Sequence, residues 1–202
     1  MNRRPPLLLM FLGSPGSGKS YMARALADRL QAVRLNGDSL RVIMYGSLEA
    51  VEKERSQVGR DVFNKRLFNG LDYCAEQVLL RGYDVVYDAS HNKKADRSRL
   101  EAMAASHGAL TVLVWVKTPY EVALKRGQMR EEQDDQRRFS EAKMREVMAR
   151  IEAATEAPTE DERVIIIDGQ ATTEQQLESF DTQLAAILET KKPSMAMEGL
   201  SW

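Results

Sequence analysis

Runs of apolar residues alternate with amphipathic segments along the whole chain. Five short apolar runs, bounded by glycine or polar residues, are typical of strands buried on both faces of a parallel sheet. These runs lie at 7–13, 32–36, 84–90, 109–118 and 163–169. Between them, apolar residues recur at helical spacing, which predicts helices at 19–30, 47–81, 93–107, from Pro119 onward, around 144–151 and at 173–190. This alternation predicts an α/β protein with helices on both faces of a five-stranded parallel sheet.

One segment and one end of the chain lack this pattern. The stretch REEQDDQRRFS, 130–140, has almost no apolar residues, so we expect an exposed, mobile loop that forms a lid at about 127–140. The tail at 193–202 has no periodicity and is predicted to be disordered. We therefore expect a single domain over 1–192. Its last helix is predicted to begin at Thr172, which stands three residues before Gln175 in capping-box spacing.

Net charge, the lengths of apolar runs and the cysteine count limit the kinds of partner and compartment that we expect for this protein. The 202 residues carry 29 basic and 30 acidic side chains, so the net charge of −1 gives no general attraction for nucleic acid or an anionic membrane. The apolar run near the N-terminus is too short for a secretory signal, and no stretch approaches the length of a membrane span. A single cysteine, Cys74, is expected in the core. We predict a cytoplasmic protein without a membrane anchor or an obligate protein partner.

The stretch GSPGSGKS follows the first apolar run and matches the P-loop (Walker A) pattern G-x-x-x-x-G-K-[ST]. Glycines let successive backbone N–H groups point into one concavity, which the N-terminus of the next helix extends. In such a loop Lys19 reaches the β- and γ-phosphate oxygens and Ser20 gives an oxygen to Mg²⁺. The sequence therefore predicts a site for ATP and Mg²⁺. Its residues are Gly13, Ser14, Pro15, Gly16, Ser17, Gly18, Lys19, Ser20 and Tyr21.

Asp38 and Arg41 follow the second apolar run, in LNGDSLR. Because they are three residues apart, they share one face of a helical turn. Asp38 could accept the proton of an attacking hydroxyl, as a kinase requires, and Arg41 could bind a phosphate or carboxylate of the acceptor. Asp38 could instead, or in addition, cap a helix that starts at Ser39. A nucleotide-dependent switch needs no such base, so the pair favours a phosphotransferase.

Two further stretches carry candidate phosphate or metal ligands. Asp88 ends the third apolar run, where a carboxylate can hold Mg²⁺ through water or orient the acceptor, or can simply be solvated. Arg126 and Arg130 are four residues apart, at the edge of the charged loop that also holds Arg137 and Arg138. Arginines there suit a lid that closes over the transferring phosphoryl group, although a charge run can also be a solvated face.

In their order, these motifs resemble the polynucleotide 5′-hydroxyl kinase family and the small P-loop kinases around it. The resemblance rests on the P-loop, D-x-x-R, a strand ending in DAS, and R-x-x-x-R, and it covers about 7–169. It implies a three-layer P-loop fold like that of adenylate kinase, with strand order 2-3-1-4-5. It also implies a catalytic set of Lys19, Asp38 as general base, Arg126 and Arg130. The implied acceptor contacts are Arg41, Asp88, Ser90 and Arg97, and the implied metal ligands are Ser20 and Asp88.

Two departures from that family leave the acceptor open. The family has Asp-Ala-Thr-Asn where this chain has Asp-Ala-Ser followed by His91, which could touch substrate, whereas His107 is expected at the surface. Gly37 before Asp38 is also similar to gluconate and adenylylsulfate kinases, and zeta-toxin-like and antibiotic phosphotransferases share the layout. The sequence thus predicts transfer to a polynucleotide 5′-hydroxyl or to a small molecule such as a sugar, an antibiotic or a nucleotide sugar. A P-loop ATPase or regulatory module without kinase activity is the third alternative.

Overall fold

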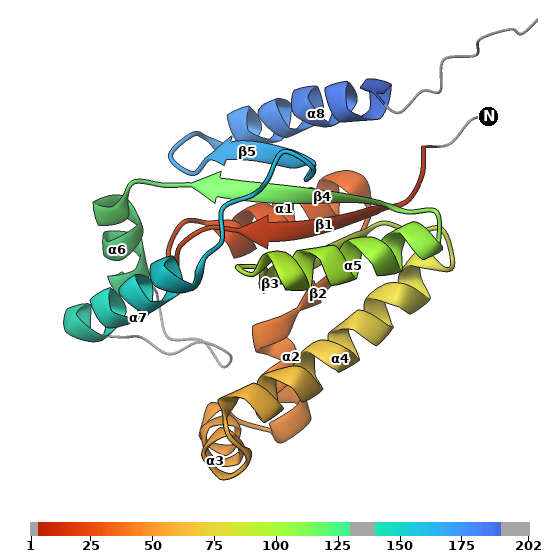
Figure 1. The fold of residues 1–202 in the computed structure, drawn as a ribbon. Helices are drawn as coiled ribbons and strands as arrows, with labels where there is room; N and C mark the ends of the chain where they lie inside the picture. Colours follow the sequence, from red (N-terminus) through yellow and green to blue (C-terminus); the bar gives the residue numbers. More distant parts are fainter. Residues whose placement is uncertain (1–3, 130–139, 191–202) are drawn as a thin grey trace, which may run out of the picture.

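A five-stranded parallel sheet forms the centre of the computed structural model, which describes residues 4–129 and 140–190 (Figure 1). The strands are β1 (Leu7–Leu12), β2 (Val33–Asn36), β3 (Val85–Ser90), β4 (Leu110–Lys117) and β5 (Val164–Asp168). Their order is β2-β3-β1-β4-β5, and every neighbouring pair is parallel. The predicted fold class and strand order are therefore confirmed, and each strand lies within one residue of its predicted ends.

Helices cover both faces of the sheet, because successive side chains of each strand point to opposite sides. On one face, Leu7, Leu9 and Phe11 pack in a core with α1 (Lys19–Leu30) and α8 (Thr173–Thr190). On the other face, Leu8, Met10 and Leu12 pack in a core with α4 (Arg60–Leu79) and α5 (Lys94–Ser106). All six side chains are buried, which explains why the first strand has no polar position.

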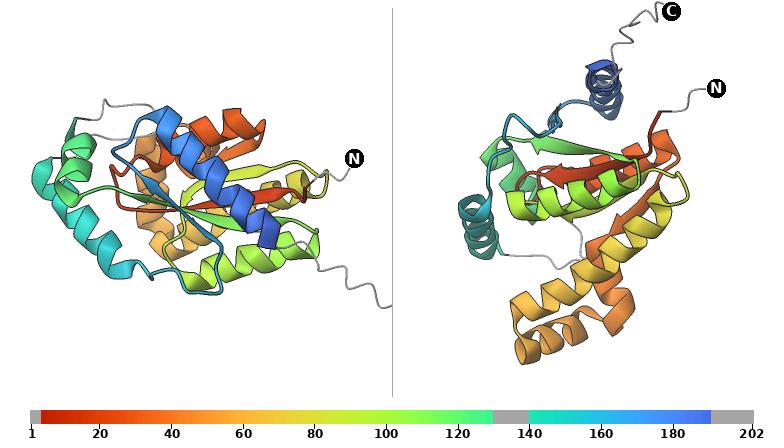
Figure 2. Two further views of the ribbon diagram at one scale, coloured as in Figure 1. Left: turned by 90° about the horizontal axis from the view of Figure 1, so that it is seen from above. Right: turned by 45° about the vertical axis from the view of Figure 1, so that its right-hand side comes forward.

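The long helical stretch expected at 47–81 begins earlier and is divided. It consists of α2 (Gly37–Tyr45), α3 (Leu48–Val58) and α4. Two glycines with positive φ, Gly46 at 85° and Gly59 at 83°, separate these helices. Figures 1 and 2 show that α3 and the beginning of α4 project away from the sheet, so this group of helices forms an arm beside the carboxyl end of β2.

Helices α6 (Tyr120–Gln128) and α7 (Glu141–Ala154) lie beyond the carboxyl ends of the central strands, at the left of Figure 1. A small core of Ala123, Leu124, Met144 and Met148 joins them. The predicted lid runs between these two helices. Most of it, including Arg130, Arg137 and Arg138, lies outside the described residues, as does the predicted tail at 193–202.

Smaller expectations have mixed outcomes. Thr172 and Gln175 form the predicted capping box, with each side chain accepting a hydrogen bond from the other's backbone N–H at 3.3 and 3.0 Å. Cys74, expected in the core, is exposed, because α4 turns that position away from the buried stripe of Leu67, Leu71 and Ala75. Within the described part of the chain, no helix is long and apolar enough to cross a membrane.

Candidate active site

The P-loop connects the buried end of β1 to the start of α1 and rests against helix α6. Gly13, Gly16 and Gly18 all have positive φ, between 79° and 145°. A Cβ atom on Gly16 would lie 2.0 Å from the Ala123 carbonyl oxygen, so only glycine fits this contact with α6. Gly18 caps α1 without a side-chain hydrogen bond, and the first turn of α1 has no acidic residue. This glycine-lined cradle therefore fits a phosphate group.

Lys19 is held across the mouth of the P-loop. Its Nζ atom donates hydrogen bonds to the carbonyl oxygens of Gly13 at 2.7 Å and Ser14 at 2.8 Å. Ser17 lies at the base of the loop with its side chain fully buried, and its carbonyl oxygen accepts a hydrogen bond from the Thr118 hydroxyl at 2.8 Å. The loop is thus fixed to the end of β4, and its lysine stands where phosphate oxygens would meet it.

Asp38 occupies the first turn of α2, but it does not cap that helix. The cap is Asn36, whose side-chain oxygen accepts a hydrogen bond from the Ser39 N–H at 2.7 Å. Asp38 instead forms an ion pair with Arg41 at 2.6 Å, on the shared helical face that the sequence predicts. With 41% of its side chain exposed, Asp38 remains accessible to a substrate. The alternative of Asp38 as a helix cap is therefore wrong.

Asp88 is buried at the carboxyl end of β3, with only 3% of its side chain exposed. Its Oδ2 atom accepts hydrogen bonds from the Arg34 guanidinium and, at 2.6 Å, from the Asn36 amide. Both partners come from β2. Asp88 therefore fastens the end of β2, and the start of α2 that follows it, to β3. The reading of Asp88 as a solvated strand end is wrong, and its role toward Mg²⁺ or the acceptor stays a prediction. Sequence reasoning missed Arg34, which lies 54 residues away.

Arg126 links α6 to the turn after β5. Its Nη1 atom donates a hydrogen bond to the Gly169 carbonyl oxygen at 2.6 Å, and the Gly169 N–H donates to the Lys117 carbonyl at 2.8 Å. Because α6 also contacts Gly16, Arg126 belongs to the walls around the P-loop. Tyr21, predicted to contact ATP, is exposed, and its hydroxyl lies 2.7 Å from that of Thr173.

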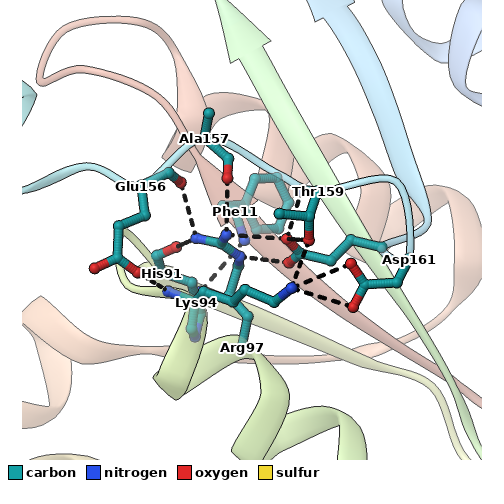
Figure 3. A network of polar contacts seen from close by, with 9 residues as sticks. Phe11, His91, Lys94, Arg97, Glu156, Ala157, Thr159 and Asp161 are labelled. Carbon is teal, nitrogen blue, oxygen red and sulfur yellow. Dashed lines mark hydrogen bonds and ion pairs between the residues drawn. The ribbon is translucent and has the colours of Figure 1, made fainter.

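Arg97 does not face the site, in contrast to the expectation that it contacts the acceptor. Its side chain is 1% exposed and forms an ion pair with Glu162, with Nε to Oε1 at 2.5 Å and Nη2 to Oε2 at 3.0 Å. Figure 3 shows its guanidinium also surrounded by the carbonyl oxygens of His91, Glu156 and Ala157, at 3.1 to 3.5 Å. All of its nitrogens are thus used within the fold, where they fasten the segment before β5 to α5.

His91 directly follows β3 and is buried against β1, not in an open site. Its Nδ1 accepts a hydrogen bond from the Phe11 N–H at 3.3 Å, while its own N–H donates to the Phe11 carbonyl at 2.9 Å, beside an irregularity in the β1–β3 pairing. Burial lowers the pKa of His91 to about 4. His91 is therefore a neutral, buried residue of the fold, and the alternative that it touches substrate is not supported. The neighbouring Ser90 is exposed, and its predicted acceptor contact stays a prediction.

A cavity of about 860 Å³ lies against β4 and β5, on the other side of β1 from Asp38. Trp115 and Ile166 form part of its floor, and Met148 and Ile151 of α7 form part of its wall. It meets the P-loop at Gly13 and Ser14, which are the only predicted site residues that line it within the described ranges. Its volume is typical of a small-molecule pocket.

A comparison with protein families matches residues 8–154 to a family described as an AAA domain. The match includes the P-loop, Asp38 with Arg41, Asp88 and α6. A search of curated proteins found no match.

Solved structures with a similar fold include several small kinases. A sugar kinase from a Janibacter species is 21% identical, with a TM-score of 0.63, over 94% of this chain and 99% of the other. A gluconokinase from Sinorhizobium meliloti is 19% identical, with a TM-score of 0.61, over 93% and 97%. The APS kinase of Mycobacterium tuberculosis, solved with AMPPNP and APS, is 16% identical, with a TM-score of 0.61, over 91% and 99%. At these identities the similarity establishes a shared P-loop kinase fold.

Proposed function

This chain belongs to the AAA domain family, and from that premise we propose that it is a kinase that transfers the γ-phosphate of ATP to a hydroxyl of a small molecule. One observation carries the proposal. An exposed carboxylate, Asp38, is held by Arg41 at the carboxyl edge of the sheet where the P-loop also lies. A protein that only hydrolyses ATP or switches between states has no need for a hydroxyl base beside its phosphate site.

The glycine cradle fits a triphosphate because its backbone conformation and its uncapped helix leave N–H groups for anionic oxygens. Lys19 would exchange its contacts with Gly13 and Ser14 for the β- and γ-phosphate oxygens. When bound, Mg²⁺ would neutralise charge at those oxygens, with Ser20 as a proposed ligand. The described residues contain no group of three or more His, Cys, Asp or Glu that could bind an ion without the nucleotide.

Asp38 acts as the general base. The acceptor hydroxyl gives its proton to the Asp38 carboxylate as its oxygen attacks the γ-phosphorus, the bond to the bridging oxygen breaks, and ADP leaves. The ion pair with Arg41 fixes the orientation of that carboxylate, and the Asn36–Asp88 contact fixes the helix that carries it. Arg126 lies on the opposite wall, where a guanidinium stabilises negative charge on the transferring group.

Two observations support a small-molecule acceptor over a polynucleotide end. The three solved relatives named above are a sugar kinase, a gluconokinase and an APS kinase. The net charge of −1 gives no general attraction to a phosphate backbone.

The direct test is to incubate the protein with γ-labelled ATP and Mg²⁺ and a panel of acceptors. The panel holds sugars, sugar acids, adenylylsulfate, aminoglycosides and nucleotide sugars, with 5′-hydroxyl DNA and RNA oligonucleotides as separate arms. Lys19→Ala, which should bind ATP poorly, is the control for contaminating activity. Labelling of a small molecule by the wild type alone supports the proposal. Labelling of oligonucleotides alone would favour the polynucleotide kinase alternative. Hydrolysis of ATP with no labelling of any acceptor would favour the regulatory ATPase.

A further inference from the structure

A second arginine lies beside Arg41 in the helical arm. Arg55 comes from α3, which packs against α2, and its charge is close enough to those of Arg41 and Asp38 to interact with both. Both side chains are partly exposed, 24% for Arg41 and 20% for Arg55, although the Nε atom of each is buried. Sequence reasoning missed Arg55, which stands in a charged stretch typical of a solvated helix.

Aromatic rings hold Arg55 in place. Its guanidinium carbon lies 5.1 Å from the centre of the Phe63 ring, and Tyr45 stacks on the same ring at 5.3 Å. Arg55 also forms an ion pair with Glu52 at 2.9 Å. These contacts come from α2, α3 and α4 together, so the arm is built to fix this side chain and does not leave it free in solvent.

Further positive charges lie near Arg55. Burial lowers the pKa of Arg55, and the positive charges of Arg41 and Arg60 lower it further against the opposing effects of Glu52 and Asp38. Among the described residues, no group accepts a hydrogen bond from the buried Nε atom of Arg41 or of Arg55. Two partly desolvated, incompletely paired cations side by side are an unfavourable arrangement that a bound anion would relieve.

We infer that Arg41 and Arg55 together bind an anionic group of the acceptor, a phosphate, sulfate or carboxylate, so that the kinase acts on a negatively charged small molecule. This inference rests on the function proposed above. The geometry explains why the anion is needed: a molecule held by these arginines lies next to Asp38, which is where its hydroxyl must lose a proton. Two adjacent guanidinium groups favour a group with several anionic oxygens, because each can donate two parallel hydrogen bonds.

The test measures anion binding without any transfer. The ¹⁵N-labelled protein, with its P-loop filled by ADP and Mg²⁺ so that anions cannot bind there, is titrated separately with inorganic phosphate, sulfate and acetate. The Nε–H signals of Arg41 and Arg55 are assigned from Arg41→Lys and Arg55→Lys. We expect both signals to shift and saturate together with at least one anion, and the strongest anion identifies the acceptor group. Arg55→Lys should weaken that binding about 10-fold, the loss of one charge-assisted contact.

Arg29→Lys is the matched control, because Arg29 forms an exposed ion pair with Asp181 at the far end of α1 and should leave anion binding unchanged. If neither signal shifts with any of the anions, or if Arg29→Lys weakens binding as much as Arg55→Lys does, the anion site is refuted. The kinase proposal fails differently. If the protein binds anions at Arg41 and Arg55 but phosphorylates no acceptor, the anion site stands and the kinase proposal is refuted. If it phosphorylates an uncharged acceptor, the kinase proposal stands and the proposal of an anionic acceptor is refuted.

Discussion

Two arginine clusters in this fold have opposite constructions. Around Arg97, every nitrogen of a fully buried guanidinium meets Glu162 or a backbone carbonyl, and the cluster joins α5 to the segment before β5. Around Arg41 and Arg55, the guanidiniums are partly exposed, each has one carboxylate partner, and like charges lie side by side. Both Arg97 and Arg41 were assigned to the acceptor from the sequence.

The difference shows how the use of hydrogen-bond donors separates structure from function. A guanidinium whose donors are all taken within the fold has nothing left for a ligand, and disturbing it costs stability. One held at a surface with unused donors contributes little to stability and can bind an anion. We therefore expect substitutions in the first cluster to affect folding and those in the second to affect phosphotransfer.

The largest expected effect tests the cluster around Arg41 and Arg55, here called the open cluster. Asp38→Asn keeps the size of the side chain but removes the base, and because Asn36 caps α2, stability should be unchanged. Transfer to the acceptor should fall by about 10²–10⁴-fold, the usual contribution of a general base, while ATP affinity is retained. Single-turnover kinetics and calorimetry with an ATP analogue measure the two quantities. Full transfer activity in Asp38→Asn would remove the difference between the clusters.

The cluster around Arg97, here called the closed cluster, should lose stability when its arginine is replaced. Arg97→Ala removes the charge partner of Glu162, which keeps only its hydrogen bonds from Thr159, and takes the guanidinium donor from three carbonyl groups, so the free energy of unfolding should fall by about 3–5 kcal/mol. Urea denaturation followed by circular dichroism measures this. Arg29→Ala, which breaks an exposed ion pair, should cost no more than about 1 kcal/mol. Equal stability of the two variants would show that the Arg97 cluster is not structural.

A pH series tests His91, whose carbonyl group belongs to the closed cluster. Burial lowers its pKa to about 4, so the unfolded chain binds a proton below about pH 6.5 that the folded chain excludes until about pH 4. Folding stability should therefore fall across this window, by roughly 2 kcal/mol at pH 5. His91→Asn keeps an acceptor for the Phe11 N–H but does not titrate, so the stability of the wild type relative to the variant should fall as the pH falls. A constant difference would contradict the assignment.

The smallest effect concerns substrate affinity alone. Arg41→Ala should raise the KM for the acceptor about 10-fold, because one charge-assisted contact is lost. The KM for ATP serves as the internal control and should be unchanged, since Arg41 pairs with Asp38 whereas Lys19 bonds within the P-loop. A variant that loses ATP affinity instead would place Arg41 with the nucleotide and weaken the proposed division between the clusters.

The strands and the P-loop could be predicted because their patterns are local. A continuous apolar run closed by glycine specifies a buried parallel strand, and the spacing of Gly13, Gly18 and Lys19 specifies a phosphate loop. Glycine alone was ambiguous within helices. Gly46 and Gly59 end helices with positive φ, yet Gly70 lies inside α4. The sequence therefore predicts one long helical stretch over 47–81, which the structure divides into α3 and α4 at Gly59.

The construction of the two clusters could not be predicted, because their contacts join distant parts of the chain. Arg97 and Glu162 are 65 residues apart, and a single sequence gives no sign that the two meet. The motif around Asp88 predicted a free carboxylate, but its partner Arg34 is 54 residues away. Burial also changes the role that a polar residue can have. His91, which the sequence leaves as a possible substrate contact, is buried and accepts a hydrogen bond from the backbone of β1.

The central position of β1 also has a consequence for synthesis of the protein. Its sequence LLLMFL is fully apolar, and its two neighbours, β3 and β4, come about 80 and 100 residues later. A growing chain therefore exposes this hexapeptide on the ribosome until Lys117 has emerged, and until then the segment has the composition of an aggregation-prone strand. Nascent chains that end before β4 should bind chaperones or aggregate, and a polar substitution at Leu9 would relieve the hazard only by destroying the finished core.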